Sequence, residues 1–457
     1  MIFLEQVIID YNDTEAYYIQ IYNYFKKQII DGILKKNEKL PSIRRLSVDI
    51  KVSKTTVESA YNQLVVEGYI NNVPKKGYFV VELRDYSFAK ADSRLGPVAE
   101  ERRPHYINNG VDRNSFDMKV WRKLYGNVLQ DWKEEIFTPG DYQGELLLRK
   151  EIWEFVQKSR GVKCSRDQIV IGAGVQYLLG ILCSLLKDNH YDIAFEYPGF
   201  IQAKNIFEDY DMDIVSIPVS KEGIDLDRLR ESKVKMVYLS PSHQYPTGSV
   251  MPIDKRIEVL NWARKNDSII IEDDYDCLIR YESRPIPALQ GLDKSGHVIY
   301  LGSFSKILLP SIRVSYMILP LDILGIYNRE KFRYTQSSSK IEQLTLAKFM
   351  GEGHLEKHLR RIRKLYHKKN ELIVNFIERN ARDKIIILGH DSGLHMMFEV
   401  NTEKTEREII REARKHNIYL EMVEGFHKGM KLVVFPYSGL EIGKIEDSLN
   451  ILVNDIF

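Results

Sequence analysis

Short apolar runs alternate with helical segments between residues 169 and 318, and this alternation constrains the fold more than any other feature. The runs cover residues 169–171, 193–195, 234–239, 269–271, 298–301 and 314–318. Strands of this length, separated by helices, predict a mainly parallel sheet covered by helices on both faces. The predicted fold class is therefore α/β, completed after about residue 381 by a small α+β subdomain.

Polar and aromatic residues follow five of these strands, at the carboxyl ends where open sheets bind ligands. In chain order they are Val175 and Gln176 at a helix start, Phe200, the segment 241–248, Asp273 or Asp274 with Tyr275, and Ser303, Ser305, Lys306 and Arg313. Together they offer an anion site, a flat ring, an acid, a phenol and a lysine. Pyridoxal 5′-phosphate (PLP) uses all of these contacts, so the pattern predicts PLP as the cofactor. Composition does not separate Asp273 from Asp274.

Lys306 is the residue expected to hold the aldehyde. Phe304, Ile307 and Leu308 flank it, and an apolar setting disfavours the charged form of an amine and makes it more nucleophilic. Taken alone, the segment also fits a surface lysine in a loop. The other four strand ends favour the functional interpretation.

The first eighty residues predict a winged helix-turn-helix. Residues 16–30 have an apolar helical face, a second helix should begin at Pro41-Ser42, and Ser53 should cap a third. Residues 69–81 then read as a β-hairpin wing with a basic tip.

Charge places a DNA contact surface on this domain. Seven basic residues lie between positions 35 and 54, against two acidic ones. The residues expected to meet DNA are Arg44, Lys54, Thr55, Thr56, Lys75, Lys76 and Gly77. The start of the third helix would face the major groove, and the wing lysines would reach the backbone or minor groove. A small helical protein-interaction domain is the alternative.

The 457 residues allow two or three domains. We predict a DNA-binding domain over 1–82, a linker over 83–105 and an effector domain over 106–457. With no apolar run near the ~20 residues of a membrane span, no signal-peptide pattern and three dispersed cysteines, we expect a cytoplasmic protein without a metal site. Seven basic residues between 357 and 369 are interpreted as a solvated helix face, with DNA phosphate contact as the alternative.

Two resemblances cover almost the whole chain. Residues 39–46, 52–57 and 60–69 resemble the winged helix-turn-helix of GntR-type regulators, and residues 241–248, 272–276 and 302–313 resemble fold-type I aminotransferases. Their combination resembles MocR-type regulators, some of which sense PLP. The resemblance implies that Lys306 binds PLP covalently, Asp273 pairs with its ring nitrogen, Tyr275 bonds its phenolic oxygen and Phe200 stacks on the ring. Val175, Gln176, Ser303, Ser305 and Arg313 would hold the phosphate.

The departures from the family pattern are informative. Tyr245 stands where aminotransferases carry an asparagine, and Gln202 and Leu432 stand where some members carry arginines. A bidentate clamp for a substrate carboxylate is then missing. We therefore expect a homodimeric regulator that binds paired DNA half-sites, senses PLP or a PLP–amine adduct and controls vitamin B6 genes. The alternatives are an aminotransferase with a DNA-binding appendage, a sensor of an amino acid or amine, and a dimerisation scaffold with Lys306 unmodified.

Overall fold

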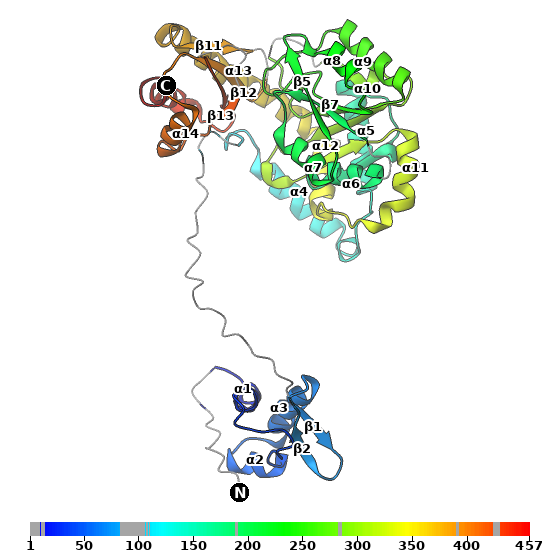
Figure 1. The fold of residues 1–457 in the computed structure, drawn as a ribbon, viewed down its shortest axis with the longest axis vertical. Helices are drawn as coiled ribbons and strands as arrows, with labels where there is room; N and C mark the ends of the chain where they lie inside the picture. The colour runs from blue at the N-terminus through cyan, green and yellow to red at the C-terminus, as the bar shows by residue number, and fades with distance from the viewer. Residues whose placement is uncertain are drawn as a thin grey trace. The chain divides into compact units, whose positions relative to one another are not determined.

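The structure is a computed structural model of the 457-residue chain. It describes residues 10, 14–82, 106, 108, 110–187, 191–281, 286–389, 393–423 and 430–457. The chain divides into two units, Met1–Arg102 and Arg103–Phe457, which are considered separately below (Figure 1). The linker predicted for 83–105 lies outside the described residues, so the domain boundaries stay predictions.

The first unit is a three-helix domain with a two-stranded wing. Its elements are α1 (Tyr17–Ile30), α2 (Ile43–Asp49), α3 (Lys54–Val66), β1 (Ile70–Val73) and β2 (Gly77–Val80). Ser42 caps α2 by accepting from the Arg45 N–H, and Ser53 caps α3 by accepting from the Thr56 N–H, which confirms the cap predicted for Ser53. Phe25 and Tyr61 pack edge to face in a core that joins all three helices to the wing.

An eight-stranded sheet forms the centre of the second unit. Its order is β3 (Ile169–Gly172), β10 (Ser315–Ile318), β9 (Val298–Ser303), β8 (Ile269–Asp274), β7 (Met236–Leu239), β4 (Ile193–Tyr197), β5 (Ile214–Ser220) and β6 (Gly223–Ile224). The five strands from β9 to β5 are parallel, whereas β10 runs antiparallel to both neighbours and β6 antiparallel to β5. The α/β class and the mainly parallel sheet are confirmed.

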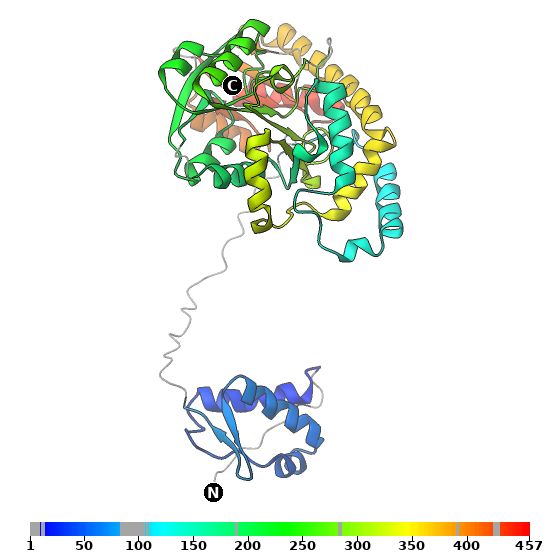
Figure 2. The same cartoon turned by 90° about the vertical axis from the view of Figure 1, so that its right-hand side faces the viewer.

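Helices cover both faces of this sheet (Figures 1 and 2). One face packs against α6 (Val175–Leu186), α7 (Ile201–Asp209) and α11 (Leu321–Glu330). The other packs against α4 (Met118–Asp131), α5 (Leu146–Arg160), α8 (Leu226–Glu231), α9 (Ile253–Asn266), α10 (Leu289–Leu292), α12 (Lys340–Gly351) and α13 (His354–Asn380). Successive strand residues point to opposite faces, so Ile270 and Ile271 of β8 belong to different cores.

A small subdomain follows the large sheet. Its antiparallel strands are ordered β11 (Ile385–Leu388), β12 (His395–Val400), β14 (Lys431–Pro436) and β13 (Glu421–Val423). They pack with α14 (Glu406–Lys415), α15 (Ile445–Ile451) and the C-terminal half of α13. The predicted α+β subdomain is therefore present. No helix in the described part of the chain is both long and apolar enough to cross a membrane.

The solvated basic face predicted for residues 357–369 is wrong in part. Lys369 is fully buried and its Nζ lies 2.7 Å from Asp112 Oδ2. Arg361 and Arg363 donate to the carbonyls of Ser115 and Leu278. Lys369 and Arg363 therefore point to loops packed on α13, whose oxygens accept their hydrogen bonds, whereas Arg361 stays exposed.

A buried ion pair ties α5 to the end of β8. Arg160 Nε donates to Asp274 Oδ2 at 2.6 Å, and both side chains are at most 2% exposed. The substitution Arg160→Met leaves the Asp274 charge buried and unpaired, which should destabilise the second unit by about 3–5 kcal/mol. The matched control is Arg333→Met, which removes an exposed pair with Glu330 and should cost about 0–1 kcal/mol. Calorimetric unfolding of both variants checks this, and equal losses would contradict it.

Candidate ligand pocket and nucleic-acid interface

A cavity of about 380 Å³ lies at the carboxyl ends of β8 and β9, beside the start of α6. Its volume is in the range of small-molecule sites. All nine predicted cofactor residues line it: Val175, Gln176, Phe200, Asp273, Tyr275, Ser303, Ser305, Lys306 and Arg313. They come from separate strand ends, as expected for an open α/β sheet. Their assembly is a fact of the fold, and the role of each stays a prediction.

One end of the cavity is built for an anion. The α6 N-terminus begins after Gly174, whose φ of 105° suits glycine, and a Cβ added there would lie 2.4 Å from Arg313 Nη2. Arg313 Nη2 donates to the Ala173 carbonyl at 2.9 Å, which fixes the guanidinium beside the helix start. The Ser305 hydroxyl is buried and has no hydrogen-bond partner among the described residues. Free helix N–H groups, a cation and an unused hydroxyl together favour a phosphate-like group.

Asp273 offers an unused carboxylate oxygen to the same cavity. Its Oδ2 accepts from the Tyr238 hydroxyl at 2.6 Å, while its buried Oδ1 has no partner among the described residues. Burial raises the pKa of Asp273 to about 7, with nearby Asp274 adding to the shift. Asp274, the next residue on β8, points to the other face of the sheet and pairs with Arg160. Strand alternation therefore separates the two acids that composition left equivalent.

Lys306 projects into the cavity between the sheet and the small subdomain. Water in the cavity reaches the Lys306 side chain. Protein atoms nevertheless surround the amine on the other sides and remove part of its hydration. Burial lowers the pKa of Lys306, and the negative charges of Asp276 and Glu421 partly offset that effect. A larger fraction of the amine is then neutral than for a lysine in water, which favours attack on an aldehyde.

Several lining or supporting residues escaped the sequence interpretation. His243 Nδ1 lies 2.7 Å from Asp276 Oδ1 and 3.1 Å from the Tyr275 hydroxyl, so this histidine orients the predicted phenol. Tyr238 reads as an ordinary core residue of β7. The cavity is also lined by His395, Tyr419, Glu421 and Ser438 from the C-terminal part of the chain. No local motif marks these residues, because only the tertiary fold brings them to the strand ends.

The residues predicted to contact DNA belong to the first unit. Arg44, Lys54, Thr55, Lys75 and Lys76 are exposed. Thr56 is half-buried at the start of α3, and its hydroxyl lies 2.7 Å from the Ser53 hydroxyl.

Gly77 opens β2 with a φ of 109°, as a wing tip requires. Because Lys54 and Thr55 are exposed, the first turn of α3 is available to a DNA groove, although Thr56 also takes part in capping. DNA contact by each residue stays a prediction.

Comparison with known families gives two matches. Residues 112–432 match the model "Aminotransferase class I and II", and residues 17–80 match "Bacterial regulatory proteins, gntR family". The chain is 40% identical over 443 residues to the uncharacterized HTH-type transcriptional regulator YdeL of Bacillus subtilis, covering 94% of this chain and 95% of that protein.

Two further relatives carry more specific names. The probable rhizopine catabolism regulatory protein MocR of Rhizobium meliloti is 27% identical over 98% of this chain and 95% of its own length. The HTH-type pyridoxine biosynthesis transcriptional regulator PdxR of Corynebacterium glutamicum is 29% identical over 78% of this chain and 77% of its own.

Solved aminotransferases share the fold of the second unit. Kynurenine aminotransferase of Pyrococcus horikoshii matches with a TM-score of 0.68 and 24% identity, over 77% of this chain and 91% of that one. An archaeal alanine:glyoxylate aminotransferase matches with a TM-score of 0.69 and 24% identity, over 76% and 88%. At this identity the likeness shows the fold alone.

The buried carboxyl of Asp273 makes the ligand-free protein sensitive to pH. Its pKa is raised from 3.8 to about 7, so folding takes up a proton between these values and stability falls as pH rises through that window. Asp273→Asn removes this effect. The variant's gain in thermal midpoint over the wild type should therefore grow from pH 5 to pH 8. Asp209→Asn, at an exposed position on α7, is the control. A gain that is constant with pH would contradict the prediction.

Proposed function

Since the chain belongs to the bacterial transcriptional regulators that join a GntR-family helix-turn-helix domain to an aminotransferase class I and II domain, we propose that it binds PLP covalently on Lys306 and that bound PLP sets its affinity for DNA. The chain is thus a DNA-binding regulator by family. PLP binding, the identity of the signal and the roles of single residues are the proposal.

The observation that carries the proposal is the unused Oδ1 of Asp273. A buried carboxylate oxygen without a partner is costly, and a pyridinium N–H is a donor that would satisfy it. The same cavity holds the anion end at Gly174 and Ser305, and the lysine with a lowered pKa. The residues present therefore fit PLP. When bound, PLP supplies an aldehyde that a lysine holds and for which free amines compete.

The other side chains position the group. Phe200 lies where a ring can stack, and Tyr275, oriented by His243, is a donor for the phenolic oxygen. Ser303, held by the Ser315 hydroxyl at 2.9 Å, joins Arg313 at the phosphate end. These roles follow the family resemblance, and the shared cavity supports them.

We propose further that the protein is a cytoplasmic homodimer that binds paired half-sites in double-stranded DNA. PLP, alone or joined to an amine, would bias the aminotransferase-like body between two arrangements and so move the two DNA-binding domains relative to the half-sites. Control of vitamin B6 genes is the simplest role if PLP alone is the signal, and the similarity to PdxR supports it. Steady conversion of an amino acid with a keto acid would instead show a working aminotransferase.

The amine of Lys306 should be required for the response to PLP. The wild type should show an absorption band at the edge of the visible range, and hydride trapping should add a pyridoxyl group to Lys306 in intact-mass analysis. Lys306→Ala should show neither, and its DNA affinity should not respond to PLP. Lys294→Ala, at an exposed position, is the matched control and should behave as the wild type. DNA affinities that are independent of PLP in the wild type would remove PLP as the switch.

The basic residues of the first unit should control the salt dependence of DNA binding. Each phosphate neutralised by a cation contributes about 0.9 to the slope of log affinity against log salt. Arg44→Ala should therefore lower the magnitude of this slope by about 0.9 for each phosphate that Arg44 neutralises, measured by fluorescence anisotropy across a salt series. Lys294→Ala again serves as the control. An unchanged slope for Arg44→Ala would exclude phosphate binding by that residue.

A further inference from the structure

Glu421 brings a carboxylate from β13 of the small subdomain into the wall of the cavity that contains Lys306. Its Oε2 accepts from the Tyr245 hydroxyl at 2.5 Å. Tyr419, two residues earlier in the chain, lines the same cavity. The charge of Glu421 adds to burial in raising the pKa of both phenols, and it opposes the lowering of the Lys306 pKa. The carboxylate therefore acts on the interior of the cavity.

Aromatic rings pack around Tyr245, the hydrogen-bond partner of Glu421. The Tyr245 ring meets Phe200, Tyr275 and His395 at centroid distances of 6.4, 6.0 and 5.0 Å, each in an edge-to-face arrangement. Aromatic faces carry negative potential, and rings beside a carboxylate attract cations. An anion brought to this place would meet repulsion from the same groups.

No basic side chain that lines the cavity forms an ion pair with Glu421 among the described residues, although Lys306 is near enough to feel its charge. Among the described lining residues of the cavity the cations are Lys306 and Arg313, and Arg313 is held at the α6 start. Burial lowers the pKa of His395 to about 4, so this imidazole is neutral at pH 7. Lys204 lines an adjoining hollow that Glu421 also lines. The Lys204 Nζ atom lies 3.4 Å from Glu208 Oε1. The Glu421 carboxylate has no cation paired with it among these groups.

We propose that the small-molecule effector of this pocket is an aliphatic amine with a second, cationic nitrogen that pairs with Glu421, and not a carboxylate-bearing amino acid. The inference rests on the proposed function, which places PLP and a competing amine at Lys306. It adds the chemical class of that amine, a diamine or a longer polyamine, chosen by the charge of Glu421 on the cavity wall. A carboxylate at that side would face Glu421 without a compensating cation among the described lining residues.

Three ligands with the same five-carbon chain provide the first test with the PLP-loaded, full-length protein. They are 1,5-diaminopentane, pentylamine and 5-aminopentanoate, which end in an ammonium, a methyl and a carboxylate group. Binding is followed by the shift of the PLP absorption band and, separately, by calorimetry. The diamine should bind at least about tenfold more tightly than pentylamine, since a charge-assisted hydrogen bond in a partly buried site has that magnitude. The carboxylate compound should bind most weakly.

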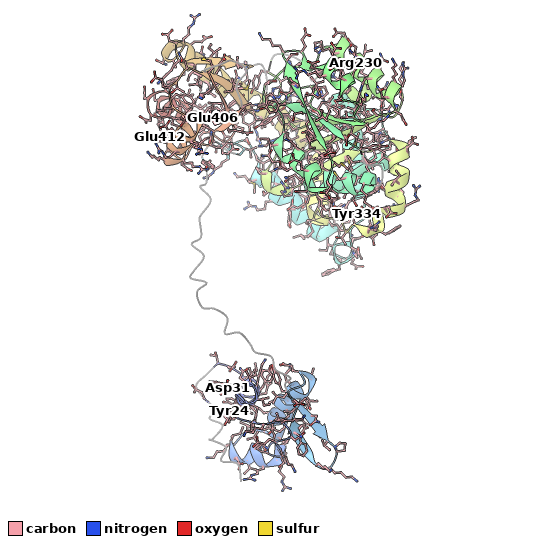
Figure 3. The ribbon with its side chains drawn as sticks, in the orientation of Figure 1. Tyr24, Asp31, Arg230, Tyr334, Glu406 and Glu412 are labelled. Atoms are coloured by element: carbon pink, nitrogen blue, oxygen red, sulfur yellow. The ribbon has the colours of Figure 1, made fainter. Side chains whose placement is uncertain are left out.

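The variant Glu421→Gln keeps the shape of the side chain and removes its charge. It should abolish the preference of the diamine over pentylamine. Glu406→Gln removes an exposed carboxylate of the same subdomain, on α14, and should keep the preference (Figure 3). DNA affinity of the wild type should respond to the diamine at concentrations where pentylamine has no effect.

The outcomes separate the two proposals. If hydride trapping finds no pyridoxyl group on Lys306, the proposed function fails and the effector inference fails with it. If PLP is bound and the wild type prefers pentylamine or the carboxylate compound, or shows no preference, the inference alone is overturned. A diamine preference that survives Glu421→Gln also overturns it. The wild-type ligand series needs no variant, so a Glu421→Gln protein that fails to fold leaves the test decisive.

Discussion

The second unit depends on how three consecutive buried acids at the end of β8 are satisfied. Glu272, Asp273 and Asp274 are each less than 9% exposed in the middle of the sheet. Both oxygens of Glu272 accept from backbone N–H groups at the start of α10, at 2.8 Å, and Asp274 accepts from Arg160 and Tyr300. Asp274 Oδ1 also has no hydrogen-bond partner among the described residues, but the charge of Asp274 is paired with Arg160, so Glu272 and Asp274 are both structural. Asp273 has the Tyr238 hydroxyl for one oxygen and, among the described residues, nothing for the other.

The Oδ1 atom of Asp273, which has no partner among the described residues, lowers the stability of the ligand-free fold, and the same atom is the proposed ligand contact. A carboxylate buried with one oxygen unused destabilises the ligand-free fold, and a bound donor removes that cost. Binding energy at Asp273 is then coupled to the stability of the strand end that also holds Tyr275. A ligand that meets Asp273 stabilises this part of the sheet, which is what a sensor domain requires of its signal.

The sequence predicted those parts of the fold and site that local patterns encode. Apolar runs with polar ends located β3, β4, β8 and β9, and with them the nine residues that line the cavity. The run at 314–318 carried no sign of its direction, so the antiparallel placement of β10 was not predictable. Lys369 read as solvent-facing because the pairing with Asp112 joins distant parts of the chain. Tyr238 lies within an apolar strand and resembled any core aromatic.

The C-terminal lining residues that the sequence interpretation missed are those on which the proposed selectivity rests. The strand ends of the sheet supply the predicted cofactor-binding residues, and sequence motifs are enough to locate them. The C-terminal subdomain supplies His395, Tyr419 and Glu421, whose meaning depends on which cavity wall they reach. Arg313 places a cation and Glu421 an anion in the wall of the cavity. A ligand that carries a phosphate at one end and a cation at the other matches both, whereas an amino-acid carboxylate beside Glu421 opposes one of them. The charge distribution of the cavity therefore orients a bound ligand before any chemistry occurs at Lys306.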